Sequence, residues 1–334
     1  MLIPTLVEVT RGDYVESRHR GSVAVVDVYG SLILSLGAVA DPIYPRSAVK
    51  PIQALPLVES GAADEFALST EALALACASH SGEPQHVEMV ARTLARLDLD
   101  LTSLECGAHW PLDELSTRAL VREASQPTAL HNNCSGKHAG FLCVARAMGL
   151  NCRGYIDTAH PVQQQVKSAI EYMTGIKLEI SAIDGCSIPT FMMPLKSLAY
   201  AFARLGTGFK LPPERAKAVN RLLTACFDHP WYFGGTNRFC TEIIGKLAPR
   251  VFVKMGAEGI FAATFPELGL GVAVKCEDGG LRAAEVIMAA LIARFLPLQE
   301  SELDSIERFI RPQIFTWNKR STGVVRPASV LFAN

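Results

Sequence analysis

The chain has 334 residues, of which 49% are hydrophobic, and this length can bury a large core as one big domain or as two lobes. Its formal net charge is -1 at pH 7, with 32 Lys and Arg against 33 Asp and Glu. No long run of basic residues occurs, so the sequence predicts neither a nucleic-acid partner nor attraction to an anionic membrane. We therefore expect a small-molecule partner.

Strand-like segments open the chain, and helical periodicity follows. Residues 5–10, 22–29 and 32–36 are rich in Val, Ile and Leu, with a tight turn expected at Gly30. From Pro51 to about Leu247 the apolar residues recur at helical spacing. The expected helices cover residues 52–59, 70–77, 84–97, 115–123, 136–148, 162–173, 195–205 and 213–227.

Strand character returns near the end of the chain. Residues 251–254, 259–264 and 269–275 are separated by turn residues, and an alanine-rich helix is expected at 281–295. Strands at both ends suggest one antiparallel sheet built from the two ends of the chain, with helices on its faces. The predicted fold is an α/β/α sandwich with an antiparallel sheet and a helical part. Within a single catalytic unit, 1–334, the sheet-containing part covers about 1–46 and 180–334, and the helical part about 47–179.

Cysteine usage and the N-terminal residues bear on the compartment. The chain has nine cysteines, an odd number, which favours free thiols or metal ligands over a disulfide framework. No stretch of about 18 apolar residues occurs, which predicts no membrane-spanning helix. The first 20 residues lack the pattern of a signal peptide. We therefore expect a cytoplasmic protein.

The segment Arg46-Ser47-Ala48-Val49-Lys50-Pro51 has the spacing of a serine nucleophile and its base. Side chains three residues apart on a helix are neighbours, so an uncharged Lys50 could take the proton of the Ser47 hydroxyl. Such a pair performs acyl transfer. The spacing also arises by chance, and Pro51 disfavours helical dihedral angles at Lys50.

Two further segments carry residues of the same chemistry. Lys254 lies on an expected strand and precedes Gly256 by two positions, as in the Lys-x-Gly segment of serine hydrolases that also use Ser-x-x-Lys. A comparable Lys319 near the C-terminus is interpreted as a lysine in solvent. Ser79, in Ala78-Ser79-His80-Ser81-Gly82-Glu83, is a candidate second hydroxyl that relays a proton to Lys254. Ser81 is instead a candidate helix cap.

A third polar segment, 131–140, contains Asn, Cys, Ser, Lys and His at the start of an expected helix. Together with Cys186, Cys134 and a His or Lys could form an open zinc site. The two cysteines are far apart in sequence and no Cys-x-x-Cys pair occurs, so buried free thiols are the alternative.

Five segments together resemble the rhizobial-type L-asparaginase II family. They are Tyr44-Pro45-Arg46-Ser47-Ala48-Val49-Lys50-Pro51-Ile52-Gln53, Ala78-Ser79-His80-Ser81-Gly82-Glu83, Asn133-Cys134-Ser135-Gly136-Lys137-His138, Asp184-Gly185-Cys186 and Lys254-Met255-Gly256-Ala257-Glu258-Gly259. Their order and their spread over nearly the whole chain make the resemblance specific. The residues from about Trp317 onward are not aligned by these segments.

The resemblance implies a fold similar to serine β-lactamases and glutaminases. It also implies hydrolysis of the L-asparagine side-chain amide to L-aspartate and ammonia by a homodimer. Carried over by position, Ser47 with Lys50 and Ser79 with Lys254 are two Ser-Lys pairs. The implied ligands of one Zn²⁺ per chain are Cys134, Lys137 and Cys186, with water completing the site.

Substrate contacts are less constrained by the sequence. Arg46 and Asp184 are candidates to anchor the α-carboxylate and α-ammonium of the substrate, and His138 is a further candidate for substrate binding or for the third zinc ligand. Ser187 stands where the resemblance leads us to expect glycine. The sequence leaves open which serine attacks, whether glutamine is also a substrate and what zinc does.

Two other functions remain compatible with the residues. A serine acyl hydrolase acting on β-lactams or peptides would share the Ser-x-x-Lys and Lys-x-Gly segments, but such enzymes usually work outside the cytoplasm. A non-catalytic zinc-binding protein would explain the cysteines and leave Ser47 without a role.

Overall fold

The computed structural model describes residues 3–333 and divides into two units. Unit 1 comprises Met1–Ala48, Met193–Thr207 and Lys246–Asn334, and unit 2 comprises Val49–Met192 and Gly208–Gly245. The sequence-based boundary between sheet-containing and helical parts differs from this division in one main respect. Residues 208–245 group with the helical unit, because α10 (Pro213–Asp228) packs against α4 (Thr70–Ala76) and α2 (Leu55–Glu59).

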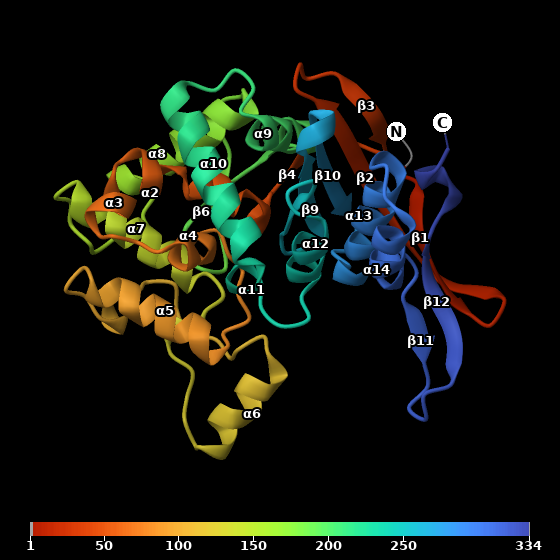
Figure 1. The fold of residues 1–334 in the computed structure, drawn as a ribbon, viewed down its shortest axis with the longest axis horizontal. Coiled ribbons are helices and arrows are strands. Elements are labelled where there is room, and N and C mark those ends of the chain that lie inside the picture. Colours follow the sequence, from red (N-terminus) through yellow and green to blue (C-terminus); the bar gives the residue numbers. More distant parts are fainter. Residues whose placement is uncertain (1–2, 334) are drawn as a thin grey trace. The chain divides into compact units, whose positions relative to one another are not determined.

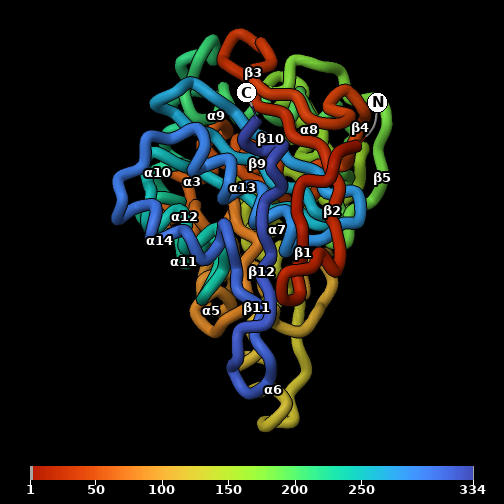
Figure 2. Tube along the Cα trace, turned by 90° about the vertical axis from the view of Figure 1, so that its right-hand side faces the viewer, coloured from red at the N-terminus to blue at the C-terminus, as the bar shows by residue number. Residues whose placement is uncertain are grey.

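Unit 1 is built on an eight-stranded antiparallel sheet (Figure 1). Its order is β11-β12-β1-β2-β10-β9-β8, with β3 also paired to β2. The strands are β1 (Thr5–Arg11), β2 (Tyr14–Asp27), β3 (Leu32–Leu36), β8 (Phe252–Met255), β9 (Ile260–Phe265), β10 (Leu270–Cys276), β11 (Gln313–Phe315) and β12 (Ser321–Pro327). Both ends of the chain therefore supply strands to one sheet, and β11, β12, β1 and β2 run side by side (Figure 2).

Helices cover the sheet of unit 1. They are α9 (Leu195–Thr207), α13 (Leu281–Phe295) and α14 (Glu300–Ile310). Strand β9 buries all six of its residues, which requires cover on both faces of the sheet. Helix α9 packs closely, because a Cβ at Gly271 would lie 1.9 Å from the Ala199 carbonyl oxygen. The predicted α/β/α sandwich with an antiparallel sheet is confirmed.

The remaining elements of unit 1 are short. They are a two-stranded sheet of β4 (Pro42–Ile43) with β7 (Met193–Pro194) and the 3-10 turns η1 (Arg46–Val49), η4 (Pro266–Leu268) and η5 (Ser329–Leu331). Helix α12 (Phe239–Leu247) runs from unit 2 to the first residues of the last segment of unit 1.

Unit 2 is mainly helical. Besides α2, α4 and α10 it contains α1 (Lys50–Gln53), α3 (Ala62–Glu65), α5 (Pro84–Ala95), α6 (Glu114–Arg122), α7 (Ser135–Ala147), α8 (Pro161–Thr174), α11 (Pro230–Phe233), η2 (Leu101–Ser103), η3 (Ala129–His131) and the strand pair β5 (Ser181–Ile183) and β6 (Pro189–Phe191). Helix α6 buries none of its residues and stands off the other helices of this unit (Figure 1).

Helix α7 is the centre of unit 2. It contacts α2, α3, α4, α5 and α8, and it is buried continuously from Ser135 to Ala145. At Gly136 a Cβ would lie 2.4 Å from the Leu75 carbonyl oxygen, so only glycine allows this approach to α4. Polar residues in such a core are costly unless they are paired. Lys137 and His138 are buried on this helix, so we expect polar partners or a functional role for their side chains.

Most of the expected elements are present, with ends within a few residues. Helix 281–295 matches α13 at both ends, and β2 begins eight residues earlier than the expected strand at 22–29. The sequence prediction missed α14 and the β11–β12 hairpin, where Lys319 lies exposed in the turn. Strand β12 pairs with β1, a contact between the two ends of the chain that local periodicity does not encode.

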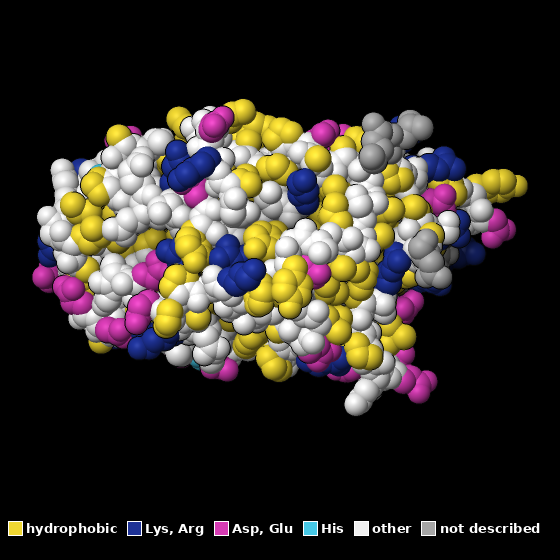
Figure 3. All heavy atoms as spheres, turned by 90° about the horizontal axis from the view of Figure 1, so that it is seen from above, with side chains coloured by type: hydrophobic (Ala, Val, Ile, Leu, Met, Phe, Trp, Pro, Cys, Tyr) yellow, Lys and Arg dark blue, Asp and Glu magenta, His cyan; other side chains and the backbone are white. Residues whose placement is uncertain are grey.

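None of the helices within residues 3–333 is both long enough and apolar enough to cross a membrane. On the face shown in Figure 3, acidic and basic side chains are interspersed and neither sign forms a broad patch. This distribution agrees with the near-zero net charge of the sequence.

Candidate functional site

Lys50 is the first residue of α1, directly after the 3-10 turn η1. Pro51 does not prevent this, because a proline in the first turn of a helix gives up an N–H that has no partner there. The helix carries the lysine side chain into the interior of unit 2, where only 1% of the residue is exposed.

The Lys50 ammonium group is enclosed by four polar groups of unit 2. Its Nζ lies 2.6 Å from the Ala78 carbonyl oxygen, 2.9 Å from Ser79 Oγ and 3.3 Å from the Asn133 carbonyl oxygen. The Cys134 thiol is also close enough to affect its pKa. Burial lowers the pKa of Lys50, the nearby Cys134 raises it and Lys137 lowers it, and the net pKa is below the ordinary value. An amine with this environment can serve as a base.

Ser79 is held in place by its neighbour His80, whose ring is fully buried. The His80 Nδ1 accepts the Gly82 N–H at 3.1 Å, so its Nε2 carries the proton and donates to Ser135 Oγ at 2.9 Å. Ser135 Oγ donates onward to the Leu130 carbonyl oxygen. Burial lowers the pKa of His80 well below its ordinary value, which keeps this ring neutral. Segment 79–82 is thereby fixed to the start of α7.

A stack of rings extends this support. The His80 ring lies 5.0 Å from His86, and the His86 ring lies 4.1 Å from Trp231 with nearly parallel planes. The expected helix cap Ser81 is not the cap, because Glu83 caps α5 and Ser81 Oγ donates to the Gly234 carbonyl oxygen at 3.1 Å.

Ser47 and Lys254 belong to unit 1. Ser47 is partly exposed in η1, just after Arg46, which has a left-handed φ of 49°. Lys254, on β8, is buried, with Nζ 3.1 Å from the Met255 carbonyl oxygen. A Cβ at Gly256 would lie 2.8 Å from the Pro45 carbonyl oxygen. The turn carrying Ser47 therefore packs on the end of the strand carrying Lys254.

A second cluster in unit 2 contains Cys134, Lys137 and Cys186, all buried. Lys137 Nζ lies 3.2 Å from Cys186 Sγ, Cys134 Sγ lies 3.3 Å from Asn133 Oδ1, and the two thiols are close enough for each to shift the pKa of the other. These three residues were the expected zinc ligands, and the structure brings them together. Two thiol sulfurs and one amine nitrogen are donors that could hold Zn²⁺ once they have lost their protons, and Lys137, whose pKa is raised, must be displaced from its charged form to take part. Within residues 3–333 no group of three His, Cys, Asp or Glu side chains could hold a metal ion.

The pKa values of the two thiols move in opposite directions. The hydrogen bond from Cys186 and the neighbouring lysines lower the pKa of Cys134, whereas the same hydrogen bond and burial raise the pKa of Cys186. Burial alone would lower the pKa of Lys137, but the adjacent thiols and Asp184 raise it above the ordinary value. These surroundings favour ionisation of Cys134 and the charged form of Lys137.

The backbone at Ser187 has the conformation for which a glycine is expected next to Cys186. Its φ is 74°, in the left-handed region that favours glycine, and its N–H donates to the Asp184 carbonyl oxygen at 2.8 Å. The serine adopts the turn conformation that a glycine would adopt more easily.

The predicted substrate contacts lie in different surroundings. Arg46 is partly exposed in unit 1, and Asp184 is partly exposed in unit 2 near Lys137. His138 is completely buried, with Nδ1 2.8 Å from the Tyr155 hydroxyl group. Its Nε2 has no hydrogen-bond partner among the described residues. This placement leaves no exposed nitrogen on His138 for a substrate.

The sequence prediction missed the backbone groups that surround Lys50. The Ala78 and Asn133 carbonyl oxygens carry no signal in residue type, so pattern reasoning could not identify them. Pairing also differs from the expectation in one respect. The sequence pairs Ser79 with Lys254, whereas in the structure Ser79 Oγ accepts a hydrogen bond from Lys50 Nζ.

The sequence model of the family described as L-asparaginase II matches residues 7–327. No curated protein sequence matches the chain significantly. Among solved structures, a β-lactamase from Mycobacterium bovis is 15% identical, covers 86% of this chain and 94% of its own, and gives a TM-score of 0.39. A D-alanine carboxypeptidase AmpC from Burkholderia cenocepacia is 12% identical, with coverages of 87% and 93% and a TM-score of 0.38.

Proposed function

Since this chain belongs to the L-asparaginase II family, we propose that it hydrolyses the side-chain amide of L-asparagine to L-aspartate and ammonia through a Ser-Lys acyl-enzyme. Family membership supports an asparaginase-like hydrolase with a small-molecule substrate. The choice of asparagine and of the covalent mechanism is our proposal.

The observation that carries the mechanism is the enclosure of Lys50. A neutral amine has two N–H groups and one lone pair. The Ala78 and Asn133 carbonyl oxygens can accept these two N–H groups, and Ser79 Oγ, which accepts from Nζ of the charged lysine, lies 2.9 Å away, so the lone pair is available for the proton of a serine. Because the pKa of Lys50 is lowered, this neutral form is accessible closer to neutral pH than for a lysine in water.

We assign the attack to Ser47, three residues before Lys50 in consecutive helical turns. Its Oγ forms the bond to the amide carbon while its proton passes to Lys50. When the carbon–nitrogen bond breaks, the leaving group takes a proton from Ser79, which is re-protonated by Lys50, and ammonia departs. Water then hydrolyses the ester and frees Ser47. We assign Lys254, buried on β8 beside the Ser47 turn, as the second lysine of this reaction.

We assign the substrate anchors to Arg46 for the α-carboxylate and Asp184 for the α-ammonium group. The opposite charges match the two ends of an amino acid, and a paired, partly buried carboxylate or guanidinium gives such recognition.

The zinc ligands in this proposal are Cys134, Lys137 and Cys186. Zn²⁺ held by these residues would supply a Lewis acid for a polar group of the substrate. Lys137 must lose its proton to coordinate the metal. We also propose a homodimer, on the family resemblance alone.

Ammonia release from L-asparagine, L-glutamine and a chromogenic β-lactam tests the proposal. We expect rapid turnover of asparagine, slower turnover of glutamine and none of the β-lactam. Turnover of the β-lactam without release of ammonia from asparagine would replace the proposed activity with that of a β-lactam hydrolase. Absence of all three activities in folded, zinc-loaded protein would overturn it.

A further inference from the structure

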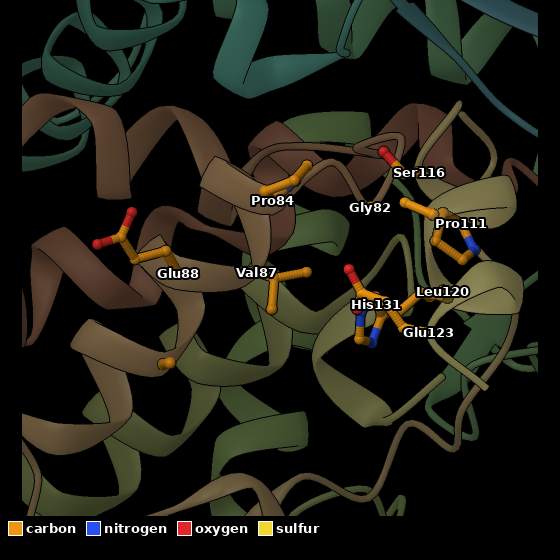
Figure 4. Close-up of a pocket in the computed structure, with 11 residues that line it drawn as sticks. Gly82, Pro84, Val87, Glu88, Pro111, Ser116, Leu120, Glu123 and His131 are labelled. Carbon is orange, nitrogen blue, oxygen red and sulfur yellow. The ribbon is translucent and has the colours of Figure 1, made fainter. Parts of the chain in front are cut away.

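A cavity of about 320 Å³ lies in unit 2 between α5, α6 and η3 (Figure 4). Its volume falls within the roughly 300–1,000 Å³ of small-molecule pockets. The walls are mainly apolar and come from Pro84, Val87, Ala91, Pro111, Ala119 and Leu120. None of the groups to which catalytic or zinc-binding roles are assigned above lines this cavity.

The floor of the cavity is fixed by close backbone contacts. Gly82 has a φ of 74°, and a Cβ there would lie 2.9 Å from the His131 carbonyl oxygen and 3.1 Å from Pro111 Cα. The Asp113 N–H donates to the Ser81 carbonyl oxygen at 3.1 Å, and the Asp113 carboxylate caps α6 by accepting from Ser116. The start of α6 is therefore attached to the loop before α5, which keeps the two walls apart in a defined geometry.

The ionisable groups of the lining favour a cation. No Lys or Arg is among the lining residues. Burial lowers the pKa of His131, whose Nδ1 accepts the Thr128 N–H at 3.0 Å, so this ring is neutral near pH 7. Glu88 is directed away from the other labelled side chains in Figure 4 and pairs with Arg92 at 2.5 Å.

Glu123 is the remaining charged group of the lining. Its carboxylate forms no ion pair or hydrogen bond with the described residues, and it stands at the C-terminal end of α6. The C-terminal end of a helix carries partial negative charge, which adds to the field of the carboxylate. An apolar cavity with one unpaired carboxylate at its edge matches a compact apolar molecule that bears an ammonium group.

We propose that this cavity is a binding site for a small hydrophobic amine, separate from the Lys50 site, with the ammonium group on Glu123 and the apolar body between Val87, Ala91 and Leu120. The proposal does not depend on the amidase activity.

The test is calorimetric titration with three isosteres: 2-phenylethylamine, the neutral 2-phenylethanol and the anionic phenylacetate. We expect saturable binding of the amine, binding of the alcohol weaker by about threefold, as for loss of an exposed ion pair, and no binding of the anion. Equal binding of the three compounds, or no saturable binding of the amine, would overturn the proposal.

Variants locate the site. Ala91→Phe fills the cavity and should weaken binding of the amine at least tenfold, while Ala95→Phe, exposed one turn later on the same helix, should leave it unchanged.

Glu123→Gln should weaken amine binding about threefold and leave the alcohol unaffected. Glu114→Gln on the same helix is the matched charge control. Unchanged amine binding in folded Ala91→Phe and Glu123→Gln, judged by circular dichroism, would place the amine elsewhere and refute the assignment.

Discussion

Lys50 and Lys137 are buried in the same unit to nearly the same extent, at 1% and 2% exposure, yet their pKa values move in opposite directions. Lys50 Nζ contacts two carbonyl oxygens and a hydroxyl group, and the nearby Cys134 and Cys186 thiols do not outweigh the effect of its burial. Lys137 Nζ contacts Cys186 Sγ. The Cys186 and Cys134 thiols and the Asp184 carboxylate all raise its pKa. Burial disfavours the charge on both lysines. Only at Lys137, which also has Asp184 nearby, do the neighbouring groups outweigh the effect of burial on the pKa.

The difference separates two kinds of chemistry. A lysine that loses its proton readily can act as a base, whereas a lysine held in its charged form stabilises a thiolate cluster until a metal displaces the proton. Variants near Lys50 can therefore be compared with matched variants near Lys137.

The largest effect is expected from Ser47→Ala. One hydroxyl group in a 3-10 turn contributes little to stability, but it is the nucleophile of the proposal, so kcat should fall by about three orders of magnitude or more. Ser79→Ala, which removes only the relay, should cost about 10- to 100-fold. Steady-state kinetics on proteins of equal thermal stability measures both. More than about a tenth of wild-type activity in Ser47→Ala would transfer the nucleophile role to Ser79.

The matched pair Lys50→Met and Lys137→Met separates the two lysines directly. Lys50→Met removes the base, so kcat should drop at least about 100-fold with zinc content unchanged. Lys137→Met should reduce zinc content and raise KM, with a smaller loss of kcat. Metal analysis and kinetics of the two variants give these values. Equal losses of kcat with unchanged zinc in both would mean that the two buried lysines do not differ in role.

A further prediction concerns the thiols. A Cys134→Ser, Cys186→Ser protein should remain folded, bind no zinc and bind substrate more weakly, whereas Cys152→Ser, a half-exposed thiol outside the cluster, should behave as the wild type. Zinc affinity of the wild type should fall steeply as pH drops, because the thiols and Lys137 bind metal only without their protons. Zinc at one equivalent per chain in the double variant would remove the metal site from this cluster.

The smallest effect is on the pH profile. The base is active when deprotonated, so kcat should rise with pH through the pKa of Lys50 and level off below the ordinary lysine value of about 10.4. Lys50→Arg, which cannot deprotonate in this range, should show no such rise. A rate that still climbs steeply between about pH 9 and 11 in the wild type would mean that Lys50 titrates as it does in water.

Much of the fold and several residues of the candidate site could be predicted from residue types and their spacing. The Ser47–Lys50 spacing, the three thiol-cluster residues and the strands at both ends of the chain were all identifiable, because each depends on local pattern or on family resemblance. Local pattern could not predict contacts between distant backbone groups. The carbonyl oxygens around Lys50 and the pairing of β12 with β1 come from positions that any residue type could occupy. Residues 208–245 were placed with the sheet because their helices carry no signal for the unit they pack against.

The most direct test of the central claim is the titration of the two lysines by NMR in metal-free protein labelled with ¹³C at the lysine Cε. Lys50→Arg and Lys137→Arg would identify the two signals. The structure predicts that Lys50 titrates below the ordinary lysine pKa of about 10.4 and Lys137 above it. A Lys50 signal that stays protonated to a higher pH than that of Lys137 would contradict the assignment of Lys50 as the base.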